Sequence, residues 1–216
     1  QMCIRDRVTP IARLTGEAEV VVVPASSPFQ TIDDLAAALK ENPGAVAIAG
    51  GSAGGTDHIA AGLFAEAAGV DPTKINYIAF SGGGEALAAI LGAQVAAGIS
   101  GYGEFESQIQ AGTLRLLAVS TEERIEGVDA PTLKEAGYDV ALENWRMVSA
   151  APGITPEQAA EITANIEKMV QSPEWKETLE RNNWQDTFLA GDAFKQQLAV
   201  DTQNTREILT KIGLVK

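Results

Sequence analysis

The order of apolar and polar residues predicts strands that alternate with helices. Residues 20–23 are four consecutive valines followed by Pro24, a pattern typical of a buried strand. Apolar residues then recur at helical spacing from Leu35 until residues 42–44, where an Asn-Pro-Gly sequence stops the pattern. Thr31 is a residue type that caps helix N-termini, so we expect this helix to begin there.

The same succession of strand, glycine-rich turn and helix then occurs three times. The strands are expected at 46–49, 75–80 and 95–99, the turns at 50–57, 81–84 and 100–103, and the helices at 58–68, 85–91 and 104–111. A further strand is expected at 114–119. Strands that alternate with helices form a parallel sheet with helices on both faces, so the sequence predicts an α/β fold.

All three glycine-rich turns are predicted to follow the carboxyl ends of strands. In an open parallel sheet, ligands bind beyond these ends. Each turn leads into a helix N-terminus, where backbone N–H groups lack partners, and glycine lets a ligand approach the backbone closely. We therefore expect the turns to form one surface that binds ligand oxygens.

The chain changes character near residue 145. Residues 145–153 are predicted to be extended and then to break. Helices are expected to open at Thr155, which begins a capping box, and again at Ser172 and Asp192. Because three helices with almost no strand do not make a compact domain, we expect them to return to a second lobe.

The composition excludes several classes of protein. Lys and Arg total 16 against 29 Asp and Glu, a formal net charge of −13, which argues against a nucleic-acid surface. No apolar run approaches the roughly 20 residues of a membrane-spanning helix. The single cysteine, Cys3, excludes a disulfide framework and a cysteine-rich zinc site. Residues 1–7 carry no apolar leader and are expected to be a non-native junction.

The stretch Gly50-Gly51-Ser52-Ala53-Gly54 also fits the G-x-S-x-G elbow of α/β serine hydrolases. Such an enzyme needs a histidine late in the chain, whereas the only one, His58, opens the helix after the turn. Two adjacent side chains, Asp57 and His58, make a poor metal site, and no turn completes a dinucleotide fingerprint. The hydrolase stays open as the alternative; we expect no catalytic residue, no metal and no cofactor.

Several stretches resemble one family, the TctC/Bug receptors of tripartite tricarboxylate transporters. The matching stretches are TPIAR (9–13), GSAGGTDH (51–58), FSGGGEAL (80–87), GYGEF (101–105), 111–120, 129–137 and NWR (144–146). Their order and spacing carry the resemblance, which runs from Val8 to Lys216. The resemblance implies a periplasmic-binding-protein-like fold in which two α/β lobes close on a ligand.

The resemblance also implies the function. Family members are periplasmic or extracytoplasmic receptors that capture citrate or another di- or tricarboxylate and deliver it to membrane transporter subunits. The receptor itself does not span the membrane, binds no nucleic acid and is expected to be a monomer when full length. The residues expected to contact the ligand are Gly51, Ser52, Ala53, Gly54, Gly55, Thr56, His58, Ser81, Gly82, Gly83, Ser100 and Gly101.

In that family, a signal peptide and a proline- and glycine-rich first-lobe turn precede the part that resembles this chain, so the chain is expected to be N-terminally truncated. Residues 8–22 would be a remnant of the first lobe with a crossing strand, 23–144 a nearly complete parallel-sheet lobe, and 145–216 the return with helices of the first lobe. Hinges are expected near Val23-Pro24 and Asn144-Trp145.

Overall fold

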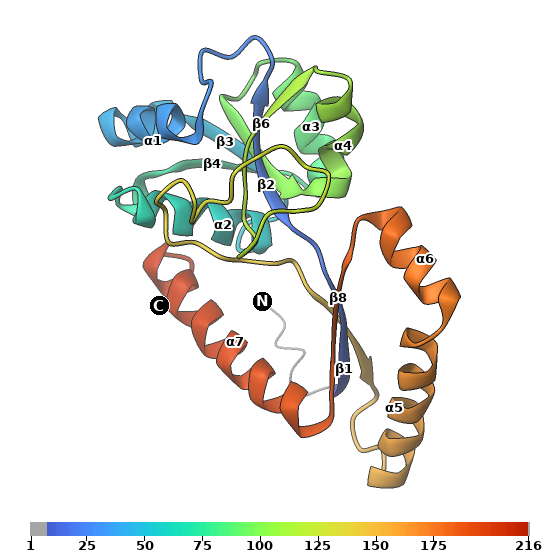
Figure 1. The fold of residues 1–216 in the computed structure, drawn as a ribbon. Helices are drawn as coiled ribbons and strands as arrows, with labels where there is room; N and C mark the ends of the chain where they lie inside the picture. The colour runs from blue at the N-terminus through green and yellow to red at the C-terminus, as the bar shows by residue number, and fades with distance from the viewer. Residues whose placement is uncertain (1–7, 216) are drawn as a thin grey trace. The chain divides into compact units, whose positions relative to one another are not determined.

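The computed structural model describes residues 8–215, in which the chain forms two compact units (Figure 1). Unit 1 comprises the chain up to Glu17 together with Trp145–Asn204, and unit 2 comprises Ala18–Asn144 together with the chain from Thr205 onward. Unit 2 therefore begins before residue 23, where the sequence placed its start. The expectations for residues 1–7, including Cys3, lie outside the described residues.

Unit 2 contains a five-stranded sheet in the order β4-β3-β5-β2-β6. Its strands are β2 (Glu19–Pro24), β3 (Ala47–Gly50), β4 (Asn76–Ala79), β5 (Ala97–Gly101) and β6 (Leu114–Val119). β3 pairs in parallel with β4 and β5, which confirms the α/β prediction. The sheet is nevertheless mixed, because β2 runs antiparallel to both of its neighbours.

The direction of β2 follows from where the chain enters unit 2. Glu19, its first residue, pairs with Gly101 at the end of β5, and Val20 pairs with Val119 at the end of β6. β2 therefore starts at the end of the sheet where the other strands finish. An all-parallel sheet would have required a crossover connection to bring the chain to the opposite end first.

Helices cover both faces of this sheet, as predicted. Figure 1 shows α1 (Ile32–Glu41) and α2 (Thr56–Ala67) on one side, and α3 (Gly83–Leu91) and α4 (Tyr102–Gln110) on the other. The valines of β2 alternate between the two cores, with Val21 and Val23 packed beside Phe64 and with Val20 and Val22 packed beside Phe105. The valine run is thus a strand buried on both faces.

Three helices of unit 2 begin earlier than predicted. Their starts were expected at residues 58, 85 and 104, whereas α2, α3 and α4 begin at Thr56, Gly83 and Tyr102. Each has a glycine as N-cap, and none of these caps makes a side-chain hydrogen bond. The usual polar capping signal was therefore missing from the sequence. In contrast, Thr31 caps α1 through a capping box, as expected for that residue.

Unit 1 contains a three-stranded antiparallel sheet in the order β7-β1-β8, which corrects the expectation of almost no strand. Its elements are β1 (Thr9–Gly16), β7 (Arg146–Ala150), α5 (Pro156–Val170), α6 (Pro173–Asn182), β8 (Gln185–Ala190) and the first part of α7 (Gly191–Lys211), a helix whose residues from Thr205 onward belong to unit 2. Ile166 and Val170 of α5 pack against Ile11 and Ala12 of β1. Helix α5 therefore has a sheet to pack on.

An ion pair links β7 to the end of β1 in unit 1. The Arg146 guanidinium lies 2.8 Å from the Glu17 carboxylate, whose side chain is only 8% exposed. The same guanidinium lies over the Trp184 ring, 5.2 Å from its centroid. Arg146 therefore neutralises a carboxylate that is almost removed from water.

Candidate functional site

The three glycine-rich turns lie at one end of the sheet in unit 2. β4, β3 and β5 are neighbours and run parallel, so the turns that follow Ala79, Gly50 and Gly101 leave the sheet at the same edge. Each turn leads directly into the N-terminus of α3, α2 or α4. The structure thus brings the predicted turn residues to a common edge, as the strand pattern indicated.

The turn after β3 is closed by its own hydrogen bonds. The Gly51 N–H donates to the Asp57 carboxylate at 2.6 Å, and the Gly55 N–H donates to the Ser52 carbonyl at 2.8 Å. The Gly54 N–H donates to Nδ1 of His58 at 3.1 Å. Gly54 has a φ of +79°, in the left-handed region that favours glycine. These contacts give the turn a defined shape.

These bonds change which donors the turn can offer. The Gly54 and Gly55 N–H groups were expected to face a ligand, but in this structure both bind within the turn. The first intrahelical bond of α2 runs from Ile59 N–H to the Gly55 carbonyl, so the N–H groups of Thr56, Asp57 and His58 precede the helical hydrogen-bond ladder. Those groups sit at the positive end of the helix dipole.

Ser52 and Ala53 are exposed at the tip of the turn, whereas Gly51 is buried. Within the described residues, the Ser52 hydroxyl has no hydrogen-bond partner. The Gly51 carbonyl accepts from the Tyr77 hydroxyl at 2.8 Å, in addition to the bond that its N–H donates. Gly51 therefore shapes the turn, and Ser52 presents a hydroxyl at its surface.

The second turn combines exposed and buried residues. Ser81 is exposed, and its N–H donates to the Glu85 carboxylate at 3.2 Å. Gly82 is half-buried and is the N-cap of α3. Gly83 is buried, and a Cβ there would lie 2.6 Å from the Ser100 hydroxyl and 2.8 Å from the Glu104 carboxyl group.

The third glycine-rich turn, at residues 100–103, is the most buried of the three. Ser100 is 4% exposed, and Gly101 is buried as well. Ser100 and Glu104 lie close to Gly83 and form a close contact of α3 with β5 and α4. The exposed polar groups of the predicted set are therefore concentrated in the first turn and at Ser81.

The His58 imidazole stacks on the Tyr77 ring, with centroids 4.1 Å apart and planes 1° from parallel. Burial lowers the pKa of His58, because desolvation disfavours the imidazolium. Burial is also the main cause that raises the pKa of Tyr77, followed by the negative charges of Asp57 and Glu19. Both rings are therefore neutral at pH 7.

The geometry does not support a serine hydrolase. Nδ1 of His58 already accepts the Gly54 N–H, so the remaining ring nitrogen of the neutral imidazole carries the proton. That nitrogen cannot take a proton from Ser52. Within residues 8–215, no group of three or more His, Cys, Asp or Glu side chains could hold a metal ion.

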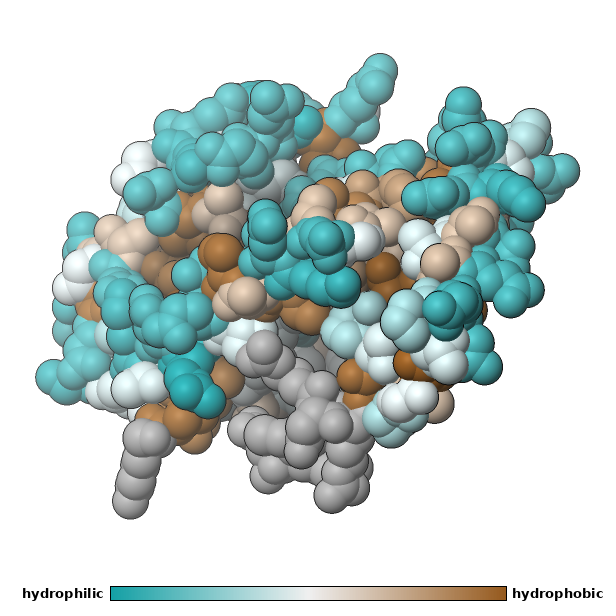
Figure 2. Space-filling view, turned by 90° about the horizontal axis from the view of Figure 1, so that it is seen from below, coloured by the Kyte–Doolittle hydropathy of each residue, from teal (hydrophilic) through white to brown (hydrophobic). Residues whose placement is uncertain are grey.

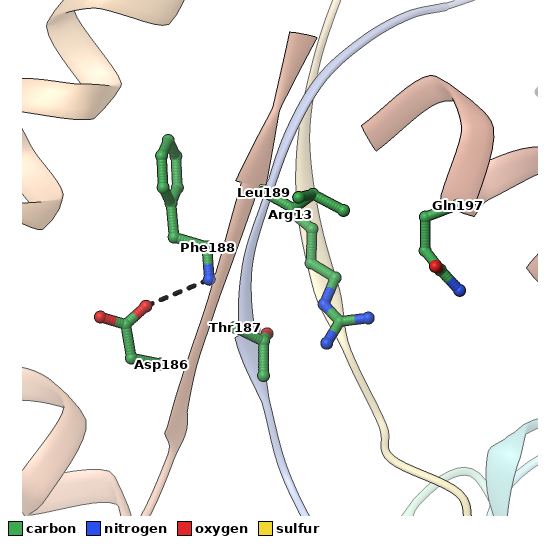
Figure 3. A pocket seen from close by; sticks show the side chains of 6 residues that line it. All are labelled: Arg13, Asp186, Thr187, Phe188, Leu189 and Gln197. Carbon is green, nitrogen blue, oxygen red and sulfur yellow. Dashed lines mark hydrogen bonds between the residues drawn. The ribbon is translucent and has the colours of Figure 1, made fainter. Parts of the chain in front are cut away.

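A recess that the sequence did not predict lies in unit 1 (Figure 3). Its volume is about 680 Å³, and it is lined by Arg13, Asp186, Thr187, Phe188, Leu189 and Gln197. Arg13 and Leu189 are register partners on β1 and β8, while their neighbours Ala12 and Ala190 pair with each other and belong to the core under α5. Arg13 and Leu189 therefore line the recess from the opposite face of that sheet, whereas Phe188 packs against the core under α5. The recess shares no residue with the predicted site.

The fold is that of the periplasmic binding protein type, which solved structures of a TctC solute binding protein and of BugD share. The family model described as "Tripartite tricarboxylate transporter family receptor" (TctC) matches residues 3–214. The chain therefore belongs to the TctC receptor family, whose members are solute receptors and not enzymes.

The relatives agree with this assignment. The UPF0065 protein in the gbd 5′ region of Cupriavidus necator is 26% identical over 95% of this chain and 62% of its own length. The crystal structure of a TctC solute binding protein from Polaromonas is 30% identical, with a TM-score of 0.77 over 98% of this chain and 72% of that chain. MatC from Rhodopseudomonas palustris, solved with bound malate, shares the fold, with 20% identity and a TM-score of 0.73 over 97% of this chain and 70% of that chain.

The chain thus spans less than two thirds of the length of the Cupriavidus necator relative. Among the described residues, no helix is both long and apolar enough to cross a bilayer. Figure 2 shows that hydrophilic side chains cover most of the face in view and separate its apolar patches into small areas.

Proposed function

We propose that this protein is an extracytoplasmic receptor that captures a small di- or tricarboxylate and passes it to the membrane subunits of a tripartite tricarboxylate transporter. The observation that carries the proposal is the meeting of three helix N-termini, each behind a glycine-rich turn, at one edge of the unit 2 sheet. Helix N-termini bind anions through unpaired N–H groups and the helix dipole. The malate bound by MatC is the kind of ligand that this edge suits.

The chemistry of the turns favours a carboxylate held by neutral donors. The turns at 50–57, 81–84 and 100–103 contain no Lys or Arg. A carboxylate there would accept from the Ser52 hydroxyl and from the N–H groups of Thr56 and His58. Charge-assisted hydrogen bonds of this kind are about twice as strong as neutral ones. The Asp57 carboxylate accepts a hydrogen bond from the Gly51 N–H, and this bond offsets part of its repulsion of a ligand carboxylate.

The twelve predicted residues divide into two groups within this proposal. The first group reaches the surface of the turns, where a ligand could contact its members directly. It consists of Ser52, Ala53, Thr56, His58, Ser81 and Gly82. The second group supports the shape of that surface, because its residues are buried or bonded within the turns. It consists of Gly51, Gly54, Gly55, Gly83, Ser100 and Gly101. The binding function requires no metal or cofactor, and we propose that the full-length receptor acts as a monomer.

A nitrogen-15 NMR titration of this chain with malate tests the location of the site, because it detects even weak binding. The proposal expects the largest shifts at the amides of residues 52–58 and at Ser81. The amides of Gly69 and Gly112, which lie in turns at the other ends of helices α2 and α4, serve as internal controls. Binding that leaves all three glycine-rich turns unshifted would remove them from the site.

A further inference from the structure

The His58 ring is held more firmly than an ordinary half-buried imidazole. Nδ1 accepts the Gly54 N–H at 3.1 Å, and one face of the ring stacks on Tyr77 at 4.1 Å. Tyr77 is itself fixed, because its hydroxyl donates to the Gly51 carbonyl at 2.8 Å. The backbone of the turn therefore sets both the position and the orientation of the imidazole.

The contact with Gly54 also decides where the imidazole proton resides. A neutral imidazole has one donor and one acceptor nitrogen. Since Nδ1 is the acceptor, Nε2 must carry the hydrogen. Protonation of Nδ1 would place two N–H groups against each other and break the bond that shapes the turn, so the geometry favours the neutral ring.

The titratable groups around the ring do not offset this preference. Asp57, on the same helix, is bound to the Gly51 N–H. Tyr77, on β4, contributes a neutral ring face, and Glu19, on β2, is a buried acid whose charge acts on Tyr77. Burial lowers the pKa of His58, which agrees with the neutral form that the hydrogen bond requires.

We propose that the Nε2–H of His58 donates a hydrogen bond to a carboxylate of the bound ligand and selects for that group. This inference rests on the proposed function and adds a role to it. An imidazole fixed in this tautomer can donate only to a ligand atom with a free lone pair, such as a carboxylate oxygen. It rejects an ammonium group, which would meet the N–H with hydrogens of its own.

The single histidine of the chain allows an unambiguous test. In the ligand-free chain, nitrogen-15 NMR of the imidazole is expected to show a protonated Nε2 and an unprotonated Nδ1 at neutral pH. Addition of malate should shift the Nε2 signal and its proton while the same tautomer persists. A free chain with the proton on Nδ1, or an imidazole that does not respond when the turn amides do, would overturn the inference.

Two substitutions separate a contact with the ligand from support of the turn. Asparagine places an oxygen near the position of Nδ1, so His58→Asn keeps an acceptor for the Gly54 N–H and loses the Nε2–H donor. Glutamine places an amide N–H near the position of Nε2, so His58→Gln keeps the donor. We expect His58→Asn to bind malate roughly tenfold or more weakly, and His58→Gln to bind more tightly than His58→Asn.

The outcomes also separate this inference from the proposal on which it rests. Equal malate affinity of His58→Asn and the unmodified chain would contradict the role of His58 and leave the receptor function standing. The Gly54 amide signal reports whether the turn keeps its shape in the variant. If no turn residue of the unmodified chain responds to malate, citrate or adipate, the proposed function fails and the role of His58 fails with it.

Discussion

At the scale of single residues, most polar groups of the turn after β3 are used to hold the turn itself. Gly51, Gly54 and Gly55 each donate their N–H to a neighbour within the turn. The exposed Ser52 hydroxyl and the first N–H groups of α2 remain outside these bonds. Ligand binding should therefore be most sensitive to Ser52 and to the conformation of Gly54.

Ser52→Ala is expected to weaken carboxylate binding by about 1.5–3 kcal/mol, the usual contribution of a hydrogen bond to a charged group. The free energy of unfolding should change little, because Ser52 is exposed. Calorimetry with malate measures the first quantity and thermal melting the second. Ser107→Ala, at an exposed position of α4, is the matched control. An unchanged dissociation constant for Ser52→Ala would mean that the hydroxyl points away from the ligand.

Gly54→Ala should lower both stability and affinity. A side chain at a φ of +79° strains the backbone by roughly 1–2 kcal/mol, and the strain falls on the turn. Gly69→Ala provides the control, since Gly69 has a φ of +77° and open space around its Cα. Thermal melting should show similar losses for both variants, while only Gly54→Ala should lose malate binding. Equal affinities in the two variants would remove the turn from the site.

At the scale of elements, the sequence predicted the order of strands and helices in unit 2 because apolar periodicity reports burial directly. The strand at 114–119 and the helix that ends at Val170 lie where the sequence placed them. The early starts of α2, α3 and α4 were missed because Gly55, Gly82 and Gly101 cap without a side chain. β8 was missed because Gln185–Ala190 lacks a β-branched run.

The contacts within the predicted site also could not be predicted from the sequence. Tyr77 arises from β4 and acts on the turn after β3, and nothing in the local pattern of either segment links them. Likewise, Gly83 was interpreted as a ligand-binding glycine, and only the structure shows its proximity to Ser100 and Glu104. Contacts between distant segments depend on sheet order, which a single sequence did not specify.

Gly83→Ala tests this packing role. Its Cβ would come within 2.6 Å of the Ser100 hydroxyl, so the contact of α3 with β5 must shift, at a cost of about 1–3 kcal/mol. Gly84→Ala is the control one position further along α3, where a Cβ meets nothing within 4 Å. It should be neutral or stabilising, because alanine favours helix more than glycine does. Denaturant unfolding compares the two, and equal stabilities would contradict the close contact.

The ion pair in unit 1 gives a second prediction for the elements. Arg146→Ala should destabilise the chain by roughly 1.5–3 kcal/mol, because it leaves the nearly buried Glu17 carboxylate without its guanidinium partner. Lys134→Ala breaks an exposed pair with Glu122, which is expected to contribute about 1 kcal/mol or less. Denaturant unfolding of the two variants should show the larger loss for Arg146→Ala. Equal losses in the free energy of unfolding would mean that burial of Glu17 does not make its ion pair more stabilising than an exposed one.

At the scale of the whole molecule, the length of the relatives bears on function. The chain spans 62% of the Cupriavidus necator relative and 72% of the Polaromonas structure. We expect that a first-lobe segment from a family member, fused to the N-terminus of this chain, strengthens citrate binding. Such a segment would add donors and exclude water from the ligand. Calorimetry of chain and fusion tests this, and equal affinities would show that the turns of unit 2 suffice.

The receptor assignment is tested most directly by thermal melting of this chain over increasing malate concentrations. A ligand that binds only the folded form stabilises it by RT ln(1 + [L]/Kd), about 2.7 kcal/mol at a hundredfold excess over Kd. The melting temperature should therefore rise with malate and remain constant with the uncharged diamide of the same skeleton at equal concentration. A melting temperature that responds to none of malate, citrate and adipate, or that rises equally with the diamide of malate, would contradict the account of a carboxylate receptor.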